Sequence, residues 1–157
     1  GAVLMVPGEA TWIDVVLPRG DELWDDDVTR SFRWLGAVWM ETLGRLGVSD
    51  AALAMHTGGL IRGDLGASVC FAGIGPGEVL ADDQDGDRVA KVVGLSQRRT
   101  RDYARFQCTV HGTWRPELYG DLLPHEVGSG RAPPAVGTVD AGPGVVFATF
   151  CGVLATV

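Results

Sequence analysis

The strongest limit on the fold of this chain is an apolar stripe with helical spacing in its first third. Six large apolar side chains recur there in steps of 4, 3, 4, 4 and 3 residues, which places them on one face of a helix. Asp25–Asp27 precede the stripe and Gly47 follows it, and both are typical helix boundaries. An amphipathic helix of this length needs a partner surface, so we expect it to pack on a sheet. The stripe consists of Val28, Phe32, Leu35, Trp39, Leu43 and Leu46.

Short segments rich in apolar and β-branched residues predict that sheet. Residues 82–87 separate two of them and are typical of an acidic hairpin loop with Asp-Gly turn chemistry. Residues 115–123 predict a short helix, and the apolar residues 144–157 predict a packed C-terminal helix. One long helix followed by clustered short strands predicts a single α+β domain over residues 1–157. The expected strands are residues 1–6, 11–18, 51–56, 67–72, 77–81, 90–95 and 104–110.

Composition excludes several classes of function. A net charge of −7 and a pI near 4.8 argue against nucleic-acid binding, which needs clustered positive charge. Cys70, Cys108 and Cys151 form no CxxC or Cys/His cluster, so we expect no metal site and reduced thiols in a cytoplasmic protein. The apolar tail is too short to cross a bilayer and no signal-peptide pattern opens the chain, so we expect no membrane partner.

Lys91 is the single lysine in a chain that otherwise uses twelve arginines. It lies in the apolar run of residues 89–93, and Gly94 follows where a backbone has to approach something closely. A lysine ammonium is a compact point charge that can bind a carbonyl or phosphate oxygen, which the planar arginine fork does differently. Two interpretations are open: an ordinary surface lysine on a strand edge, or a charge kept for ligand contact.

Two other motifs carry little chemistry by themselves. Residues 73–77 read Gly-Ile-Gly-Pro-Gly, but a strand rather than a helix is expected after them, so they predict a turn and not a dinucleotide-binding loop. Four arginines fall within residues 98–105. They predict either a solvent-exposed loop or a local basic patch that attracts phosphates or an acidic partner.

A resemblance to a known superfamily begins at Lys91. The segment KVVGLSQRR is similar to the K-(V/I)-x-G-S-A-Q-x-R signature of lipoate–protein ligases, octanoyltransferases and biotin–protein ligases. In the same order as in that family, residues 1–8 resemble the end of its acyl-adenylate loop, residues 69–71 with Glu78 resemble its strand before the lysine, and Phe106-Gln107 resembles its (F/L)-(H/Q) pair. The resemblance runs from residue 1 to about residue 123. The chain has Met5 and Cys108 where the family has histidine, although His111-Gly112-Thr113 restores a similar triplet in a shifted register.

The resemblance implies a mixed, antiparallel-rich sheet with flanking helices, as in the catalytic domain of class II aminoacyl-tRNA synthetases and biotin–protein ligases, here lacking the family's N-terminal segment. It implies an enzyme that uses ATP and Mg²⁺ to activate lipoate or octanoate as acyl-AMP. The acceptor would be a lysine on the lipoyl carrier domain of a 2-oxoacid dehydrogenase or glycine cleavage protein. Lys91 would stabilise the charge on the acyl-adenylate. The other implied binding residues are Gly1, Ala2, Val3, Gly94, Ser96 and Gln97.

Two alternatives to a lipoate–protein ligase remain open: a cysteine-dependent transferase and a member that only binds. Cys70-Phe71 resembles the nucleophile dipeptide of cysteine-dependent octanoyltransferases, and a thiolate beside a lysine ammonium could carry an acyl thioester without ATP. Cys70 could equally be a buried strand cysteine acting as a small apolar side chain. The missing Arg-Arg-Gly segment, Met5 and Cys108 favour a third interpretation, a degenerate member that binds an acyl ligand or a protein without turnover.

Overall fold

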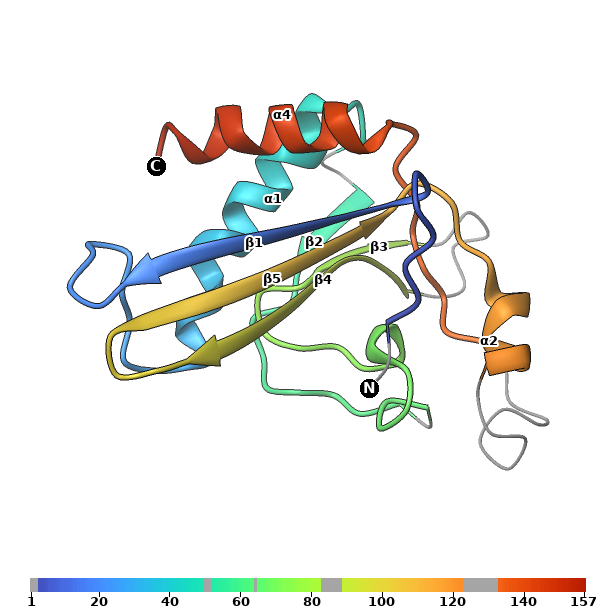
Figure 1. The fold of residues 1–157 in the computed structure, drawn as a ribbon, viewed down its shortest axis with the longest axis horizontal. Helices are drawn as coiled ribbons and strands as arrows, with labels where there is room; N and C mark the ends of the chain where they lie inside the picture. The colour runs from blue at the N-terminus through green and yellow to red at the C-terminus, as the bar shows by residue number, and fades with distance from the viewer. Residues whose placement is uncertain (1–2, 50–51, 64, 83–88, 123–132) are drawn as a thin grey trace.

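The computed structural model describes residues 3–49, 52–63, 65–82, 89–122 and 133–157. At its centre lies a five-stranded antiparallel sheet with the strand order β1-β5-β4-β3-β2. Helices α1 (Arg33–Arg45) and α4 (Pro143–Leu154) cover one face of this sheet (Figure 1). The predicted α+β class is therefore confirmed. The strands are β1 Ala10–Pro18, β2 Leu53–Met55, β3 Val79–Asp82, β4 Val89–Arg99 and β5 Tyr103–His111.

The predicted early helix is confirmed, but it starts later than the stripe. A 3-10 turn over Arg30–Phe32 leads into α1, and Val28 is 54% exposed before it. Asp27 caps this entrance, because its Oδ1 accepts hydrogen bonds from the amides of Thr29 (2.8 Å) and Arg30 (3.1 Å). Gly47 has a φ of +90°, a left-handed conformation that ends the helix at little cost for glycine.

Aromatic side chains fill the space between the helices and the sheet. Phe106 on β5 is fully buried, and its ring meets those of Phe32 and Trp34 edge-on, with centroids 5.5 and 5.4 Å away. Trp39 on α1 packs on Phe150 of α4 with centroids 4.6 Å apart. Each such side chain contributes about 1.5–3 kcal/mol through burial. The core therefore lies on the helix side, and the opposite face is left for other segments.

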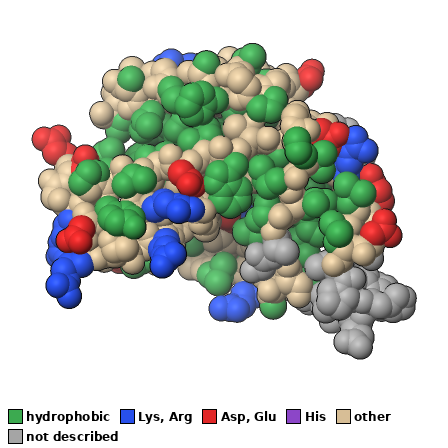
Figure 2. All heavy atoms as spheres, viewed as in Figure 1, with side chains coloured by type: hydrophobic (Ala, Val, Ile, Leu, Met, Phe, Trp, Pro, Cys, Tyr) green, Lys and Arg blue, Asp and Glu red, His purple; other side chains and the backbone are tan. Residues whose placement is uncertain are grey.

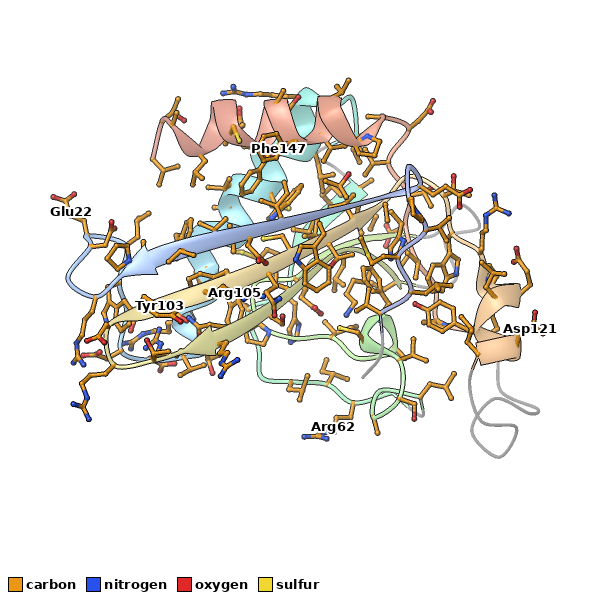
Figure 3. All side chains as sticks on the ribbon, in the orientation of Figure 1. Glu22, Arg62, Tyr103, Arg105, Asp121 and Phe147 are labelled. Atoms are coloured by element: carbon orange, nitrogen blue, oxygen red, sulfur yellow. The ribbon has the colours of Figure 1, made fainter. Side chains whose placement is uncertain are left out.

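The predicted short helix and C-terminal helix are also confirmed. Helix α2 covers Pro116–Leu122 at one end of the sheet, and α4 begins at Pro143, one residue before the predicted start (Figure 1). Phe147 lies on the outer surface of α4 and is 54% exposed (Figure 3). Within the described residues, no helix has both the length and the apolar character needed to cross a membrane.

Two predicted strands are wrong. Residues 3–6 have no strand structure, and the amide of Leu4 donates instead to the Tyr119 hydroxyl on α2 (3.1 Å). Residues 67–72 form turns that end in a 3-10 turn over Cys70–Ala72. The predicted hairpin loop at residues 82–87 falls almost entirely outside the described residues; β3 and β4 on either side of it pair antiparallel.

The sheet carries the candidate site on the face opposite the helices. Residues 135–138 add two parallel bridges to the sheet, one from Val136 to Lys91 and one from Thr138 to His111. The predicted mixed pairing is therefore limited to these bridges, because all five described strands run antiparallel. Residues 65–78 lie below the sheet in the view of Figure 1, and their 3-10 turn contacts β4 through Lys91.

Candidate functional site

Lys91 is buried inside the protein and its ammonium is fully occupied. Only 2% of the residue is exposed, and Nζ donates to the carbonyl oxygens of Cys70 (2.9 Å) and Gly73 (2.6 Å). It also contacts both carboxylate oxygens of Glu78, at 3.1 and 3.0 Å. Three N–H groups thus face four protein acceptors. The surface-lysine interpretation is wrong, and the ammonium ties segment 70–78 to the sheet.

A shift in strand register directs Lys91 toward this segment. Val79 of β3 lies opposite Val93 of β4, whereas Leu80 lies opposite Lys91, so Val92 has no opposite residue. An extra residue of this kind reverses the alternation of side chains along the strand. Lys91 and Gly94 therefore point to the same side, and both meet the ring of Phe71: Nζ lies 4.8 Å from its centroid.

Gly94 is where the chain makes its close approach. A Cβ placed on Gly94 would lie 3.0 Å from Cε2 and 3.1 Å from Cζ of Phe71. Only glycine leaves this space for the ring. The prediction that the backbone approaches something closely after Lys91 is confirmed, and the approaching group is an aromatic side chain from the 3-10 turn.

Glu78 is the partner of Lys91 that sequence reasoning did not assign to the site. Its carboxylate is 3% exposed and also accepts the amides of Gly75 (2.7 Å) and Leu95 (3.0 Å). Burial raises the pKa of this carboxyl, while the Lys91 charge and the two amides act in the opposite direction. The available signal was a single acidic residue beside the apolar run of β3.

A small pocket gathers four of the predicted site residues: Val3, Cys70, Gly94 and Ser96. These residues come from the N-terminal segment, the 3-10 turn and β4. The cavity has a volume of about 20 Å³, enough for a water molecule or two but not for an acyl chain. The pocket is therefore a shallow depression open to solvent, and two of its lining residues, Trp12 and Ser96, are exposed. Its remaining lining residues are Trp12, Phe71, Leu95, Gln107 and Thr109.

Two other predicted site residues, Lys91 and Gln97, do not line this pocket. Gln97 lies on β4 with its side chain on the helix side, where Oε1 is 3.4 Å from the Ser31 hydroxyl. Strand alternation explains this, because Gln97 and Ser96 must face opposite sides. Gly1 and Ala2 lie outside the described residues. Lys91 contacts the pocket wall through the hydrogen bond from its ammonium to the main-chain carbonyl of Cys70.

The three cysteines lie in different surroundings, and none forms a disulfide. Cys70 is half-buried and lines the pocket, so it is not a fully buried core residue. Cys108 faces the core, and burial raises its thiol pKa to about 12. It therefore stays a protonated thiol at the position that resembles the family's histidine. Cys151 is exposed on α4.

An aromatic wall closes the end of the site next to α2. The ring of His111 lies edge-on to Phe71 and Trp114, with ring centroids 4.8 and 5.3 Å away. The rings of Trp114 and Tyr119 also pack together, with their centroids 5.0 Å apart. His111 is 3% exposed, and its Nε2 has no hydrogen-bond partner among the described residues. Burial lowers the pKa of His111 below its usual value of 6.5, so the ring is neutral at pH 7.

The arginines that follow Lys91 do not form a uniform positive surface. Arg105 pairs with Asp14 of β1 at 3.3 Å, and Arg99 stacks on Trp24 with its guanidinium 4.5 Å from the ring. Figure 2 shows positive and negative side chains next to one another on this side of the molecule, and Figure 3 labels Arg105 there. The alternating charges support the interpretation of a solvated surface over that of a basic patch.

The described residues contain no cluster of three His, Cys, Asp or Glu side chains that could hold a metal ion. No known protein-family model matches this chain, and no curated protein sequence matches it.

Proposed function

We propose that this chain is a lipoate–protein ligase-like catalytic domain. It would activate lipoate or octanoate with ATP and pass the acyl group to a lysine of a lipoyl carrier domain. The observation that supports this is the meeting of Val3, Cys70, Gly94 and Ser96 in one pocket whose Cys70 carbonyl accepts a hydrogen bond from Lys91. The resemblance names all four residues, and they come from three separate parts of the chain.

Gly94 and Lys91 have different parts in this proposal. Gly94 lets the Phe71 ring lie against β4, where the ring forms part of the pocket wall. Lys91 supplies a fixed positive charge in a water-poor environment, where it stabilises developing negative charge strongly. Mg²⁺ usually keeps several waters and binds through phosphates with few protein carboxylates. With no three-ligand cluster among the described residues, Mg²⁺ would arrive bound to the phosphates of ATP.

The position of Cys70 supports a second candidate, an acyl transfer without ATP. The Cys70 thiolate would attack an acyl thioester, forming a new thioester at Sγ and releasing the donor's thiol. The carrier lysine amine would then attack that thioester, forming the amide and returning Cys70 as a thiol. Cys70 lines the pocket directly, whereas the Lys91 ammonium is already bound to protein oxygens. The occupied ammonium also fits the third possibility, binding without turnover.

One set of variants separates these candidates. Wild type, Lys91→Ala and Cys70→Ser are incubated with octanoate and ATP, or with an octanoyl thioester, and a lipoyl carrier domain. Intact-mass measurements then detect the acylated carrier and any acyl-protein. ATP-dependent transfer lost in Lys91→Ala supports the ligase. A trapped thioester lost in Cys70→Ser but kept in Cys151→Ser supports the transferase. Saturable binding with no acylated carrier overturns both.

A further inference from the structure

The Glu78 carboxylate is held by main chain on two sides as well as by Lys91. Two backbone amides donate to it, Gly75 from the turn before β3 and Leu95 from β4. Each carboxylate oxygen therefore has a main-chain donor in addition to Lys91. These charge-assisted hydrogen bonds fix the place of the negative charge that the Lys91 ammonium faces.

Among the described residues, Glu78 is the one carboxylate within ion-pair distance of Lys91. The other two acceptors of the ammonium are uncharged carbonyl oxygens of Cys70 and Gly73. An ammonium buried without a negative partner is strongly disfavoured and gives up its proton. Glu78 thus supplies the negative charge that compensates the buried Lys91 ammonium.

The four oxygens that accept hydrogen bonds from the Lys91 ammonium differ in whether a ligand oxygen could replace them. A carbonyl or phosphate oxygen of a ligand carries the same kind of lone pair as the Cys70 and Gly73 carbonyls, and Cys70 lines the pocket. Glu78 does not line the pocket and is bound to the main chain of β4 at Leu95. A ligand could therefore take the place of one carbonyl on Nζ while the Lys91–Glu78 pair stays intact.

We propose that Glu78 is a positioning residue for the acyl transfer, holding the Lys91 ammonium charged and directed toward the Cys70 side of the pocket. This inference rests on the proposed function, since it gives Lys91 its task there. Glu78 acts through Lys91 and does not itself touch the reacting atoms.

The single lysine makes this inference directly measurable. Protein labelled with ¹⁵N-lysine gives one side-chain ammonium signal, that of Lys91. Wild type, Glu78→Gln, Lys91→Met and the double variant are compared, with Glu41→Gln on the exposed face of α1 as the matched control. We expect a protected ammonium signal at neutral pH in wild type and Glu41→Gln, and its loss in Glu78→Gln. We expect kcat for octanoyl transfer to fall roughly 10²-fold in Glu78→Gln, as when one transition-state donor is removed.

The double variant provides the decisive comparison. If Glu78 acts through Lys91, the double variant is no slower than Lys91→Met alone. A further drop in the double variant, or a Glu78→Gln protein that keeps both its signal and its rate, overturns the inference. If wild type transfers no acyl group but Glu78→Gln still loses the signal, the proposed function fails while the hold of Glu78 on Lys91 stands.

A measurement on wild type covers the case in which Glu78→Gln does not fold. The ¹³C signal of the Glu78 carboxyl and the ¹⁵N signal of Lys91 are followed together during acidification. We expect them to change over the same pH range, because the two groups share hydrogen bonds. Independent changes would overturn the inference.

Discussion

Replacing Lys91 with Met tests how much of the stability depends on the buried ion pair. The substitution keeps an unbranched side chain of similar length but removes the charge that faces Glu78. The carboxylate would keep its two amide donors and lose its counter-charge, while 3% exposed. Removing one partner of a buried pair costs about 3–5 kcal/mol. That is a large share of the 5–15 kcal/mol typical of a domain.

Urea unfolding at pH 7, followed by tryptophan fluorescence, measures this loss. Arg45→Met is the matched control, because it breaks the exposed Arg45–Glu41 pair on α1, which is worth about 0.3–0.5 kcal/mol. The double variant Lys91→Met/Glu78→Leu removes both charges and should recover part of the loss, because the amides of Gly75 and Leu95 then lose their acceptor. A single Lys91→Met variant that loses less than about 1 kcal/mol would show that the pair does not hold segment 70–78.

The pH dependence of this variant has a definite sign. The Glu78 carboxyl already has a raised pKa because of burial, and removing Lys91 raises it further. A raised carboxyl pKa means that the folded protein binds more protons than the unfolded chain, so stability falls as pH rises from about 4.5 through the folded pKa. Lys91→Met should therefore be less destabilised at pH 5 than at pH 8.

Two further predictions concern other buried groups. The pKa of His111 is lowered by burial, so the unfolded chain binds the extra proton and wild type should lose stability as pH falls below about 6.5. His111→Phe should flatten this dependence in urea unfolding at pH 7.5 and 5.5, and an unchanged dependence would contradict the assignment to His111. Cys151 is exposed and should react with a thiol reagent at once, whereas the half-buried Cys70 should react more slowly. Cys108 should react only after unfolding, because burial raises its pKa to about 12. Rapid modification of Cys108 in the folded protein would contradict the core described above.

The elements that the sequence predicts correctly are those whose stability comes from a regular pattern. Phe32, Leu35, Trp39 and Leu43 are all buried, because the helical period alone fixes which side of α1 faces the sheet. The close approach at Gly94 was predictable for a similar reason, since glycine in a strand has few other uses. Its partner, Phe71, was not predictable, because it lies 23 positions earlier in the chain, before both β3 and β4.

The wrong strand at residues 67–72 has a physical cause that no local pattern reveals. The backbone of Cys70 and Gly73 finds its hydrogen-bond donor in a lysine side chain from β4, not in a neighbouring strand. The burial of Lys91 follows from the same contacts and from the carboxylate of Glu78. A lone lysine in an apolar run indicated that the charge matters, but not that the protein itself supplies its partners.

Substituting Gly94 with Ala tests whether this close contact shapes the pocket. The new Cβ would lie 3.0 Å from Cε2 of Phe71, and that ring is held by His111 on one side and by the Lys91 ammonium on another, each 4.8 Å away. Since the ring cannot move freely, we expect the overpacking to cost about 1–3 kcal/mol, read from the midpoint of urea unfolding.

Gly144→Ala is the matched control for this substitution. Gly144 lies in the first turn of α4, and a Cβ there meets nothing within 4 Å. Alanine should stabilise that helix by about 0.5–1 kcal/mol. The two variants add the same methyl group, so opposite signs would locate the cost in the contact with Phe71. Equal stabilisation by both would mean that Phe71 moves aside easily, and the pocket wall would then be far less rigid than its contacts with His111 and Lys91 imply.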